Sequence, residues 1–335
     1  MHLIDISGWE IDEAFSPYPE GSRNKYALIA PDERCPKQIL PGHRYLMKFS
    51  NQRYPVQFWS EVIAEIVGQQ MGVPTPRTFV AVDPTSGEPG SLIEWFYGPK
   101  LEHAAKMPKG FALGSAWRAI FGVKEEAPKT HSLYVPGSSY MTRIIPGYDL
   151  KAGTQHNFVD IAVWISLFSK SARYDYWLYW AKVLLFDAII GNTDRHQDNW
   201  GVLWRSDDDG NLVPKFAPAF DNGTSLAHEI MEDRVVNFTT DDAVSRYINR
   251  GRHHMKWQRK DDRKCPHFEL IQKVVKFRKN TLEPLKAILE LNFSPAYDEI
   301  RNLTTAEVSV PLSAARADLI CRMIDRRITK FREVL

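Results

Sequence analysis

The feature that most constrains the fold is a long apolar helical pattern that runs directly into a polar loop. Residues 174–190 carry apolar side chains at three- and four-residue steps, which predicts a buried helix. Gly191 follows, and glycine is the common residue just after a helix end. The loop 191–199 reads GNTDRHQDN, and two strand-like segments, 200–204 and 215–220, flank a turn at 206–210. The pattern therefore predicts a helix, an exposed polar loop and a strand pair in succession.

Periodicity divides the rest of the chain into a strand-rich first part and a helical second part. Strand patterns cover 25–31, 44–49, 77–82 and 91–97, and a helical pattern opens at Pro55 and stops at Gly72. Helical patterns return at 157–170 and 266–291. A final helix is expected to bury Leu319, Met323, Ile324, Ile328 and Phe331.

These patterns predict an α+β, bilobed fold. Residues 1–98 form a strand-rich N-lobe with a phosphate loop, a lysine strand and a glutamate helix, and residues 99–335 form a mainly helical C-lobe. The length of 335 residues and the 44% of hydrophobic residues are ample for both lobes. The periodicity assigns no element to residues 98–152.

Composition narrows the cellular setting and the kind of partner. A formal charge of +2 does not by itself call for nucleic acid or an anionic membrane. Cys35, Cys265 and Cys321 form no C-x-x-C pair, which favours a reducing compartment over a disulfide framework. The amino end has no signal-like segment, and no apolar run is long enough to span a membrane. We expect a cytoplasmic protein with no direct nucleic-acid binding and no membrane insertion.

The polar loop has the residue types that phosphoryl transfer requires. Asp194 and Asn199 stand in a D-x-x-x-x-N spacing, and Asp221 opens a second polar turn, Asp221-Asn222-Gly223. One carboxylate, Asp194, would accept the proton of an attacking hydroxyl, while Asn199 and Asp221 offer the hard oxygen ligands that Mg²⁺ prefers. A polar turn between a helix and a strand would contain similar residues. The surrounding order of elements favours an ATP- and Mg²⁺-dependent kinase.

Lys48 is the candidate ATP lysine. It lies among apolar residues in the predicted strand 44–49, from which a lysine can reach ATP phosphates if a helical carboxylate holds it. Glu61 on the next helix is the first candidate for that carboxylate, and Glu65, one turn further, competes with it. Alternatively, Lys48 points outward from an edge strand.

Weaker signals complete the candidate nucleotide site. Gly21 and Ser22 precede the first strand and could bring backbone N–H groups to a phosphate, although the segment matches neither standard glycine-rich motif. Ile93 and Phe96, near the lobe boundary, are candidates for the adenine pocket, and a plain buried strand explains them equally well. Residues 246–264 are locally basic and could receive a protein substrate, an acidic partner or nucleic acid, but neighbouring aspartates favour a solvated face.

Three segments together resemble the HipA-like serine/threonine kinases. They are 58–74, the loop with Asn192-Thr193-Asp194-Arg195-His196 and Asn199, and Phe220-Asp221-Asn222-Gly223. The loop is also similar to that of phosphoinositide kinases and of atypical secretory-pathway kinases. The resemblance spans the chain from about residue 21 to its end.

The resemblance implies a protein-kinase-like fold with ATP and Mg²⁺ between its two lobes, a protein substrate and a separate antitoxin-like regulator. It implies Lys48 as the ATP lysine with Glu61 as its partner, Asp194 as the catalytic aspartate, and Asn199 and Asp221 as metal ligands. Autophosphorylation in the phosphate loop, as in some members, would point to Ser22. Two departures stand out: Lys48 comes too early for the extra amino-terminal subdomain of longer members, and the phosphate loop matches poorly.

Other functions are compatible with the same residues. A phosphoinositide kinase shares the loop chemistry, but the sequence shows no dense polybasic anchor. A nucleotide-binding pseudokinase would be expected to lose one of the four key residue types, and all four are present. Transfer of another group from ATP, such as AMP, is a third alternative.

Overall fold

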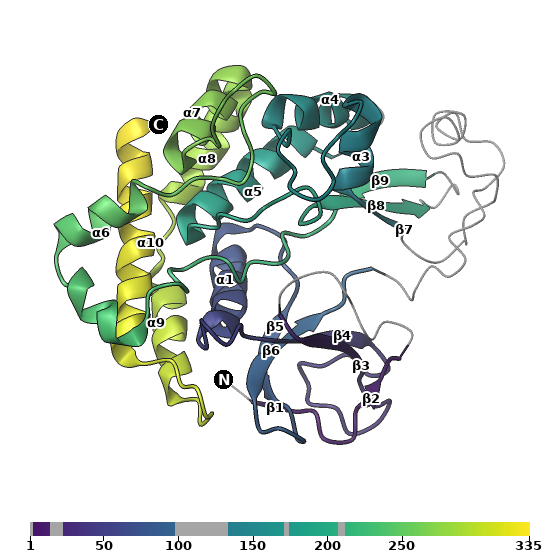
Figure 1. Cartoon of the computed structure of the whole chain (residues 1–335), viewed down its shortest axis with the longest axis vertical. Coiled ribbons are helices and arrows are strands. Elements are labelled where there is room, and N and C mark those ends of the chain that lie inside the picture. The colour runs from purple at the N-terminus through teal and green to yellow at the C-terminus, as the bar shows by residue number, and fades with distance from the viewer. Residues whose placement is uncertain (1–2, 14–22, 98–132, 171–173, 207–211) are drawn as a thin grey trace.

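The amino-terminal part of the chain is a six-stranded sheet with one helix against it (Figure 1). The structure is a computed structural model, and it describes residues 3–13, 23–97, 133–170, 174–206 and 212–335. The strands are β1 (Ile4–Asp5), β2 (Glu10–Ile11), β3 (Lys25–Ile29), β4 (Arg44–Phe49), β5 (Thr78–Val82) and β6 (Pro89–Glu94), in the order β1-β5-β6-β4-β3-β2. Only β1 and β5 pair in parallel among these described strands.

Lys48 lies on a central strand of this sheet. On β4 it is paired with Lys25 of β3 on one side and with Ser91 of β6 on the other. Its side chain is only 6% exposed. The alternative of an outward-pointing lysine on an edge strand is therefore wrong.

Helix α1 (Gln57–Met71) joins the sheet to the helical lobe. Most of its residues are buried, and it ends at Gly72, whose φ of +62° is the left-handed conformation that glycine adopts at low cost. The indole N–H of Trp59 donates to the carbonyl of Val310 across the molecule, at 3.0 Å. Since α1 belongs to the same large apolar core as the helices of the C-lobe, its orientation is fixed by both lobes.

The carboxyl-terminal part is mainly helical and carries a second, three-stranded sheet. That sheet has the order β7 (Leu133–Pro136), β8 (Gly201–Ser206), β9 (Leu212–Phe216), all antiparallel. The helices beside it are α3 (Gly137–Ile144), α4 (Phe158–Phe168) and α5 (Tyr176–Ile190). Helix α5 buries nearly all its residues, so it forms the centre of this lobe.

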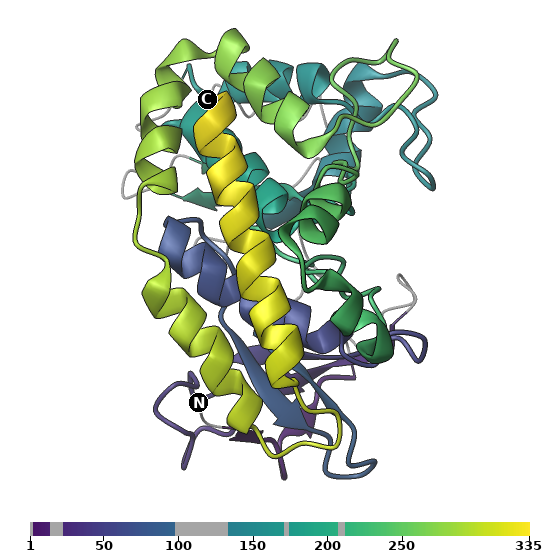
Figure 2. The same cartoon turned by 90° about the vertical axis from the view of Figure 1, so that its left-hand side faces the viewer.

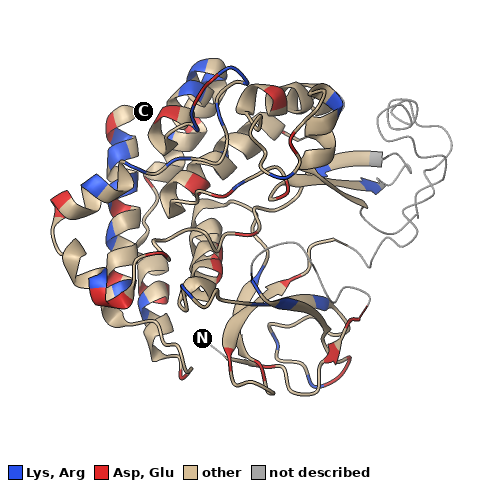
Figure 3. Ribbon diagram, viewed as in Figure 1, with Lys and Arg blue, Asp and Glu red and all other residues tan. Residues whose placement is uncertain are grey.

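The remaining helices complete the C-lobe and extend towards the N-lobe (Figure 2). They are α6 (Asp241–Ile248), α7 (His267–Phe277), α8 (Leu282–Leu289), α9 (Ser294–Asn302) and the long α10 (Ala314–Val334), with short 3₁₀ turns at Glu232–Phe238, Lys279–Thr281 and Leu303–Thr305. Helices α9 and α10 lie side by side, and α9 also contacts α1. Acidic and basic residues are interspersed along α6, α9 and α10 (Figure 3), in keeping with the small net charge.

The predicted α+β, bilobed architecture is confirmed, and several element bounds differ from the expectation. The strand expected at 215–220 ends at Phe216, because Ala217 donates to the carbonyl of Gly201 and Ala219 to that of Pro74, which turns the chain towards the N-lobe. The helical pattern 266–291 is divided by a 3₁₀ turn at Lys279–Thr281. Strand β7 and helix α3 occupy part of the segment that the sequence left unassigned.

Two features predicted from the sequence fall in segments that the structure does not describe. The predicted lobe boundary at 98/99 and the turn at 207–210 lie outside the described residues. In the described part of the chain, no helix combines the length and the apolar character that crossing a bilayer requires.

Candidate active site

The polar loop is built on the carboxyl end of α5. The helix stops at Gly191, with φ +68°, and the amide of Asn192 donates to the Asp187 carbonyl at 2.7 Å. The side-chain oxygen of Asn192 accepts from the Asp194 amide at 2.9 Å. The side-chain nitrogen of Asn199 donates to the Asp194 carbonyl at 2.7 Å. The two predicted residues Asp194 and Asn199 are therefore held together by one hydrogen bond.

Arg195 fixes this loop from beneath. Its guanidinium donates to both carboxylate oxygens of Asp187, at 2.6 and 3.0 Å, and to the carbonyls of Asn199 and Phe220. It also donates to Oδ1 of Asn222 at 2.7 Å. Since Phe220 and Asn222 flank Asp221, one buried arginine positions both the Asp194 loop and the Asp221 turn.

Lys48, Glu61 and Asp221 meet in one ion-paired cluster. The ammonium of Lys48 donates to Oε1 of Glu61 at 2.8 Å and to Oδ1 of Asp221 at 2.5 Å. Arg23 adds a second cation, because its Nη2 lies 3.0 Å from each of the same two oxygens. The cluster unites side chains that are up to 198 residues apart in the sequence.

The carboxylates of this cluster are held in their ionised form. Burial favours the neutral form of Glu61, but Lys48 and then Arg23 outweigh it and lower the pKa of Glu61 below its ordinary value. The same balance lowers the pKa of Asp221 strongly. Both groups therefore carry negative charge at neutral pH, which a cation-binding carboxylate requires.

Asp221 is held in an unusual backbone conformation. Its φ of +54° is uncommon for a residue other than glycine and costs free energy. The next amide, that of Asn222, donates to Oε2 of Glu61 at 2.8 Å, and Ser225 donates to the Asn222 carbonyl at 2.5 Å. These bonds offset the cost and aim the Asp221 side chain at Lys48.

Asp194 lies in a half-buried position beside basic groups. Burial raises its pKa, the charges of His196 and Lys264 oppose that rise, and Asp221 adds to it. Lys264 comes from the locally basic segment 246–264, and His254 of the same segment packs its ring 5.8 Å from that of His196. Part of this segment therefore faces the candidate base and is more than a solvated surface.

Glu61, and not Glu65, is the carboxylate that pairs with Lys48. Glu65 accepts instead from the side chain of Gln69, and burial raises its pKa to about 7. The geometry thus decides between two candidates that the sequence left open.

The structure places two of the four residues predicted to line the nucleotide pocket. Gly21 and Ser22 lie outside the described residues. Ile93 is a buried residue of β6, two positions beyond the Ser91 that pairs with Lys48. The ring of Phe96 lies 5.0 Å from that of Phe220 and 5.8 Å from that of Tyr134, so it is at the junction between the lobes. The adenine-pocket role of Ile93 and Phe96 stays a prediction.

The donor set suits a cation shared with phosphate oxygens. Asn199 uses its amide nitrogen on Asp194, so its amide oxygen is the atom that can ligate a metal. Lys48 and Arg23 both bond to Oδ1 of Asp221, whose side chain is 34% exposed. Among the described residues, no three His, Cys, Asp or Glu side chains group into a metal site of their own. A Mg²⁺ ion held by one amide and one carboxylate, with its other ligands from water and phosphate, fits this set.

Sequence reasoning missed three residues that build the site. Asp187 and Asn222 position Arg195, and Arg23 completes the ion cluster. Asp187 had a signal, because it is the one acidic residue in the apolar run 176–190. Arg23 had none, since polar residues in loops are common, and Asn222 belongs to the turn Asp221-Asn222-Gly223 but the pattern assigns it no role.

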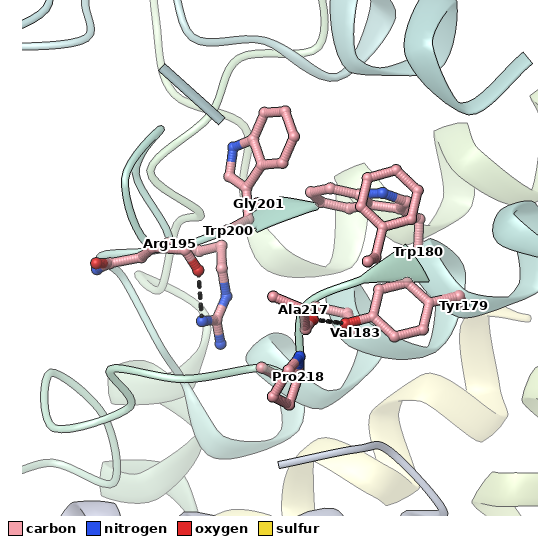
Figure 4. Close-up of a pocket in the computed structure, with 11 residues that line it drawn as sticks. Tyr179, Trp180, Val183, Arg195, Trp200, Gly201, Ala217 and Pro218 are labelled. Atoms are coloured by element: carbon pink, nitrogen blue, oxygen red, sulfur yellow. Dashed lines mark hydrogen bonds between the residues drawn. The ribbon is translucent and has the colours of Figure 1, made fainter. Parts of the chain in front are cut away.

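A small cavity lies behind the loop and is separate from the ion cluster (Figure 4). It is lined by Arg195, Asn199, Trp200 and aromatic residues of α5, and Tyr179 donates to the Ala217 carbonyl at its edge. Its volume of about 10 Å³ is about what one water molecule needs. It is too small to hold a nucleotide.

Comparison with known proteins identifies the fold. No protein-family model matches the chain, and no curated protein matches it. The crystal structure of CtkA, a proinflammatory kinase of Helicobacter pylori, matches with a TM-score of 0.69 and 17% identity, over 99% of this chain and 96% of that one. HipA of Shewanella oneidensis, solved with HipB and operator DNA, matches with a TM-score of 0.48 and 14% identity, over 94% of this chain and 66% of HipA. The chain has the bilobed, kinase-like fold of CtkA.

Proposed function

We propose that this chain is an ATP- and Mg²⁺-dependent kinase that transfers the γ-phosphate to a Ser or Thr hydroxyl of a protein. The observation that carries the proposal is the ion cluster of Lys48, Glu61 and Asp221, which Arg195 ties to the Asp194 loop. A lysine on a central strand, a glutamate on the following helix and two polar turns are the parts that phosphoryl transfer uses. The kinase-like fold adds to this support.

Each residue has a distinct role in the proposed reaction. Asp194 accepts the proton of the attacking hydroxyl. Lys48 donates to phosphate oxygens and is kept in place by Glu61. Asn199 and Asp221 would hold the metal, which supplies charge neutralisation to the phosphate oxygens when it is bound. Arg195 keeps Asp194 and Asp221 at a fixed separation, because its guanidinium bonds to both segments.

The acceptor class and the partner rest on the sequence resemblance to HipA-like kinases. That resemblance supports a protein Ser or Thr acceptor, membership of the HipA-like family and a separate antitoxin-like regulator. It also supports a cytoplasmic location. The adenine would lie near Ile93 and Phe96, and the phosphates near Gly21, Ser22 and Lys48.

A phosphate-transfer assay on cell extract tests the proposal. The purified chain is incubated with γ-labelled ATP and Mg²⁺, and modified sites are mapped by mass spectrometry. Asp194→Asn is expected to lower the rate by ~10²–10⁴-fold, because it removes the proton acceptor. Asp298→Asn is the control: Asp298 lies on α9, its side chain is 74% exposed, and the rate should stay within about twofold.

The product distinguishes the proposal from its alternatives. Label on Ser or Thr of proteins supports it. Label confined to phosphoinositide vesicles would indicate a lipid kinase, and an added mass of AMP would indicate nucleotide transfer. Nucleotide binding without transfer to protein or lipid would indicate a pseudokinase.

A further inference from the structure

Arg23 is the one member of the ion cluster to which the proposed reaction assigns no role. It lies two residues before β3, and its side chain is only 9% exposed. Its Nη2 bonds to Glu61 and Asp221 at 3.0 Å each, the same two oxygens that Lys48 uses. Two cations therefore share two carboxylates, so the cluster is already neutral without a ligand.

The other terminal nitrogen of this guanidinium is buried and unsatisfied. Among the residues that the structure describes, none accepts a hydrogen bond from Nη1 of Arg23. A buried N–H group without an acceptor is destabilising, so native proteins rarely leave one unpaired without a reason. An anionic ligand that bonds to Nη1 would remove this cost.

Gly223 makes room for the guanidinium on the metal-binding turn. A Cβ atom at Gly223 would lie 2.4 Å from Nη1 and 2.7 Å from Nη2 of Arg23, closer than real contacts allow. The unpaired nitrogen is thus held against the turn that carries Asp221. This is where the phosphates of a metal-bound nucleotide have to lie if Asp221 holds the metal.

The negative charge of a nucleoside triphosphate also favours a contact between Arg23 and a phosphate. A nucleoside triphosphate carries more negative charge than one Mg²⁺ ion cancels, so the site needs cations beyond the metal. Lys48 provides one, and Arg23 is a second cation in direct contact with Asp221. An arginine can keep one nitrogen on a carboxylate and present the other to a phosphate, because its donors form a planar fork.

We propose that Arg23 binds a phosphate oxygen of the nucleotide through Nη1 while Nη2 keeps its bonds to Glu61 and Asp221. This inference rests on the proposed kinase function. Arg23 is then a nucleotide-binding residue that couples phosphate binding to the position of the metal-binding carboxylate. Adenosine, which has no phosphate, gains nothing from it.

Isothermal titration of the full chain with adenosine, AMP, ADP and ATP, each with Mg²⁺, tests the proposal. Arg23→Gln is expected to weaken ADP and ATP binding by ~10–100-fold, the range for a hydrogen bond to a charged group, and to leave adenosine unchanged. Arg23→Lys keeps the charge but has no fork, and several-fold weakening is expected. Gly223→Ala displaces the guanidinium and should weaken the same nucleotides.

Two controls distinguish loss of a phosphate contact from misfolding of the variant or a nonspecific effect of removing an arginine. Arg77→Gln removes an exposed arginine of the same lobe whose side chain lies over Phe79, and its ADP affinity should equal that of the wild type. Thermal unfolding without ligand shows whether each variant is folded. Arg23→Lys retains a cation for Glu61 and Asp221, so it stays informative if Arg23→Gln fails to fold.

The outcomes distinguish the inference from the function on which it rests. Wild type that binds ADP while Arg23→Lys and Gly223→Ala bind it equally well, or more tightly, would overturn the role of Arg23 alone. Tighter binding would mean that Arg23 obstructs the site. Wild type that binds no adenine nucleotide would overturn both the inference and the kinase proposal.

Discussion

Arg195 and Asp187 form a two-pronged ion pair inside the C-lobe, with Nη2–Oδ1 at 2.6 Å and Nε–Oδ2 at 3.0 Å. The Arg195 side chain is 1% exposed and that of Asp187 is fully buried. The pair connects the last turn of α5 to both polar turns of the candidate site. Loss of this ion pair should therefore lower both the stability of the fold and the rate of phosphate transfer.

Removal of Arg195 should destabilise the protein strongly. Arg195→Ala leaves the Asp187 carboxylate buried without its counter-ion, a change that costs about 3–5 kcal/mol. Urea unfolding, monitored by circular dichroism, measures the loss of unfolding free energy. Arg301→Ala, which breaks the exposed pair with Asp318, is the control and should leave the midpoint unchanged. Equal midpoints for the two variants would show that the buried pair is not structural.

Substitution of Glu61 should lower the rate of phosphate transfer far more than substitution of Glu65, although the two residues lie one turn apart on α1. Glu61→Gln weakens the hold on Lys48 and on the Asn222 amide, so the rate of phosphate transfer should fall by ~10²-fold through misplacement of the lysine. Glu65→Gln removes no contact of the site, and its rate should match the wild type. Steady-state kcat/KM for both variants checks this; a reversed order would assign the lysine partner to Glu65.

The acid side of the pH–rate profile should report Asp194. Burial raises its pKa above the ordinary value of 3.8, so the base is lost at a higher pH than for an exposed aspartate. The positive charge of Lys264 opposes this rise, and Lys264→Ala should therefore move the acid limb to still higher pH. The profile of kcat/KM against pH measures the shift, with circular dichroism at each pH to confirm folding. An unmoved limb would place the proton acceptor elsewhere.

Buried histidines should make the fold sensitive to acid. Burial lowers the pKa of His156 and His253 well below the ordinary value of 6.5, and that of His267 to about 3. The unfolded chain therefore binds more protons below about pH 6.5, and stability falls there by up to ~1.4 kcal/mol per pH unit for each such histidine. At higher pH these groups are neutral in both states and the dependence vanishes.

A substitution at His253 tests this account of the acid sensitivity. Within the described part of the chain neither ring nitrogen of His253 has a hydrogen-bond partner, and its ring packs 4.5 Å from that of His267. His253→Phe should keep the packing and reduce the slope of unfolding free energy against pH between 5 and 6.5. The reduction should correspond to about one proton fewer taken up on unfolding. Urea midpoints at several pH values provide the slope. An unchanged slope would mean that other groups set the acid sensitivity.

The site could be predicted from the sequence where local pattern and chemistry coincide. The helix that ends at Gly191 fixes the place of Asp194, and α1 and β4 have nearly the predicted bounds, because strong apolar periodicity and glycine or proline signals define them. The choice of Glu61 over Glu65 needed tertiary structure, since both lie on the same side of one helix.

Other parts could not be derived from one sequence because long-range contacts create them. Arg23 reaches Asp221 across 198 positions, and nothing local marks it. Lys264 and His254 approach the Asp194 loop only because segment 246–264 folds back over it. The strand expected at 215–220 ends early because Ala219 bonds to Pro74 in the connection from α1, a contact that no propensity scale contains.

A crystal structure with a non-hydrolysable ATP analogue, and with Mn²⁺ in place of Mg²⁺, would show where the metal and the phosphates bind. Anomalous scattering locates the manganese without ambiguity. We expect one ion bonded to a carboxylate oxygen of Asp221 and the amide oxygen of Asn199, next to phosphates that Lys48 contacts. Manganese bound elsewhere, with Asp221 and Asn199 free of it, would show that these two residues are not the metal ligands and that the proposed active site is wrong.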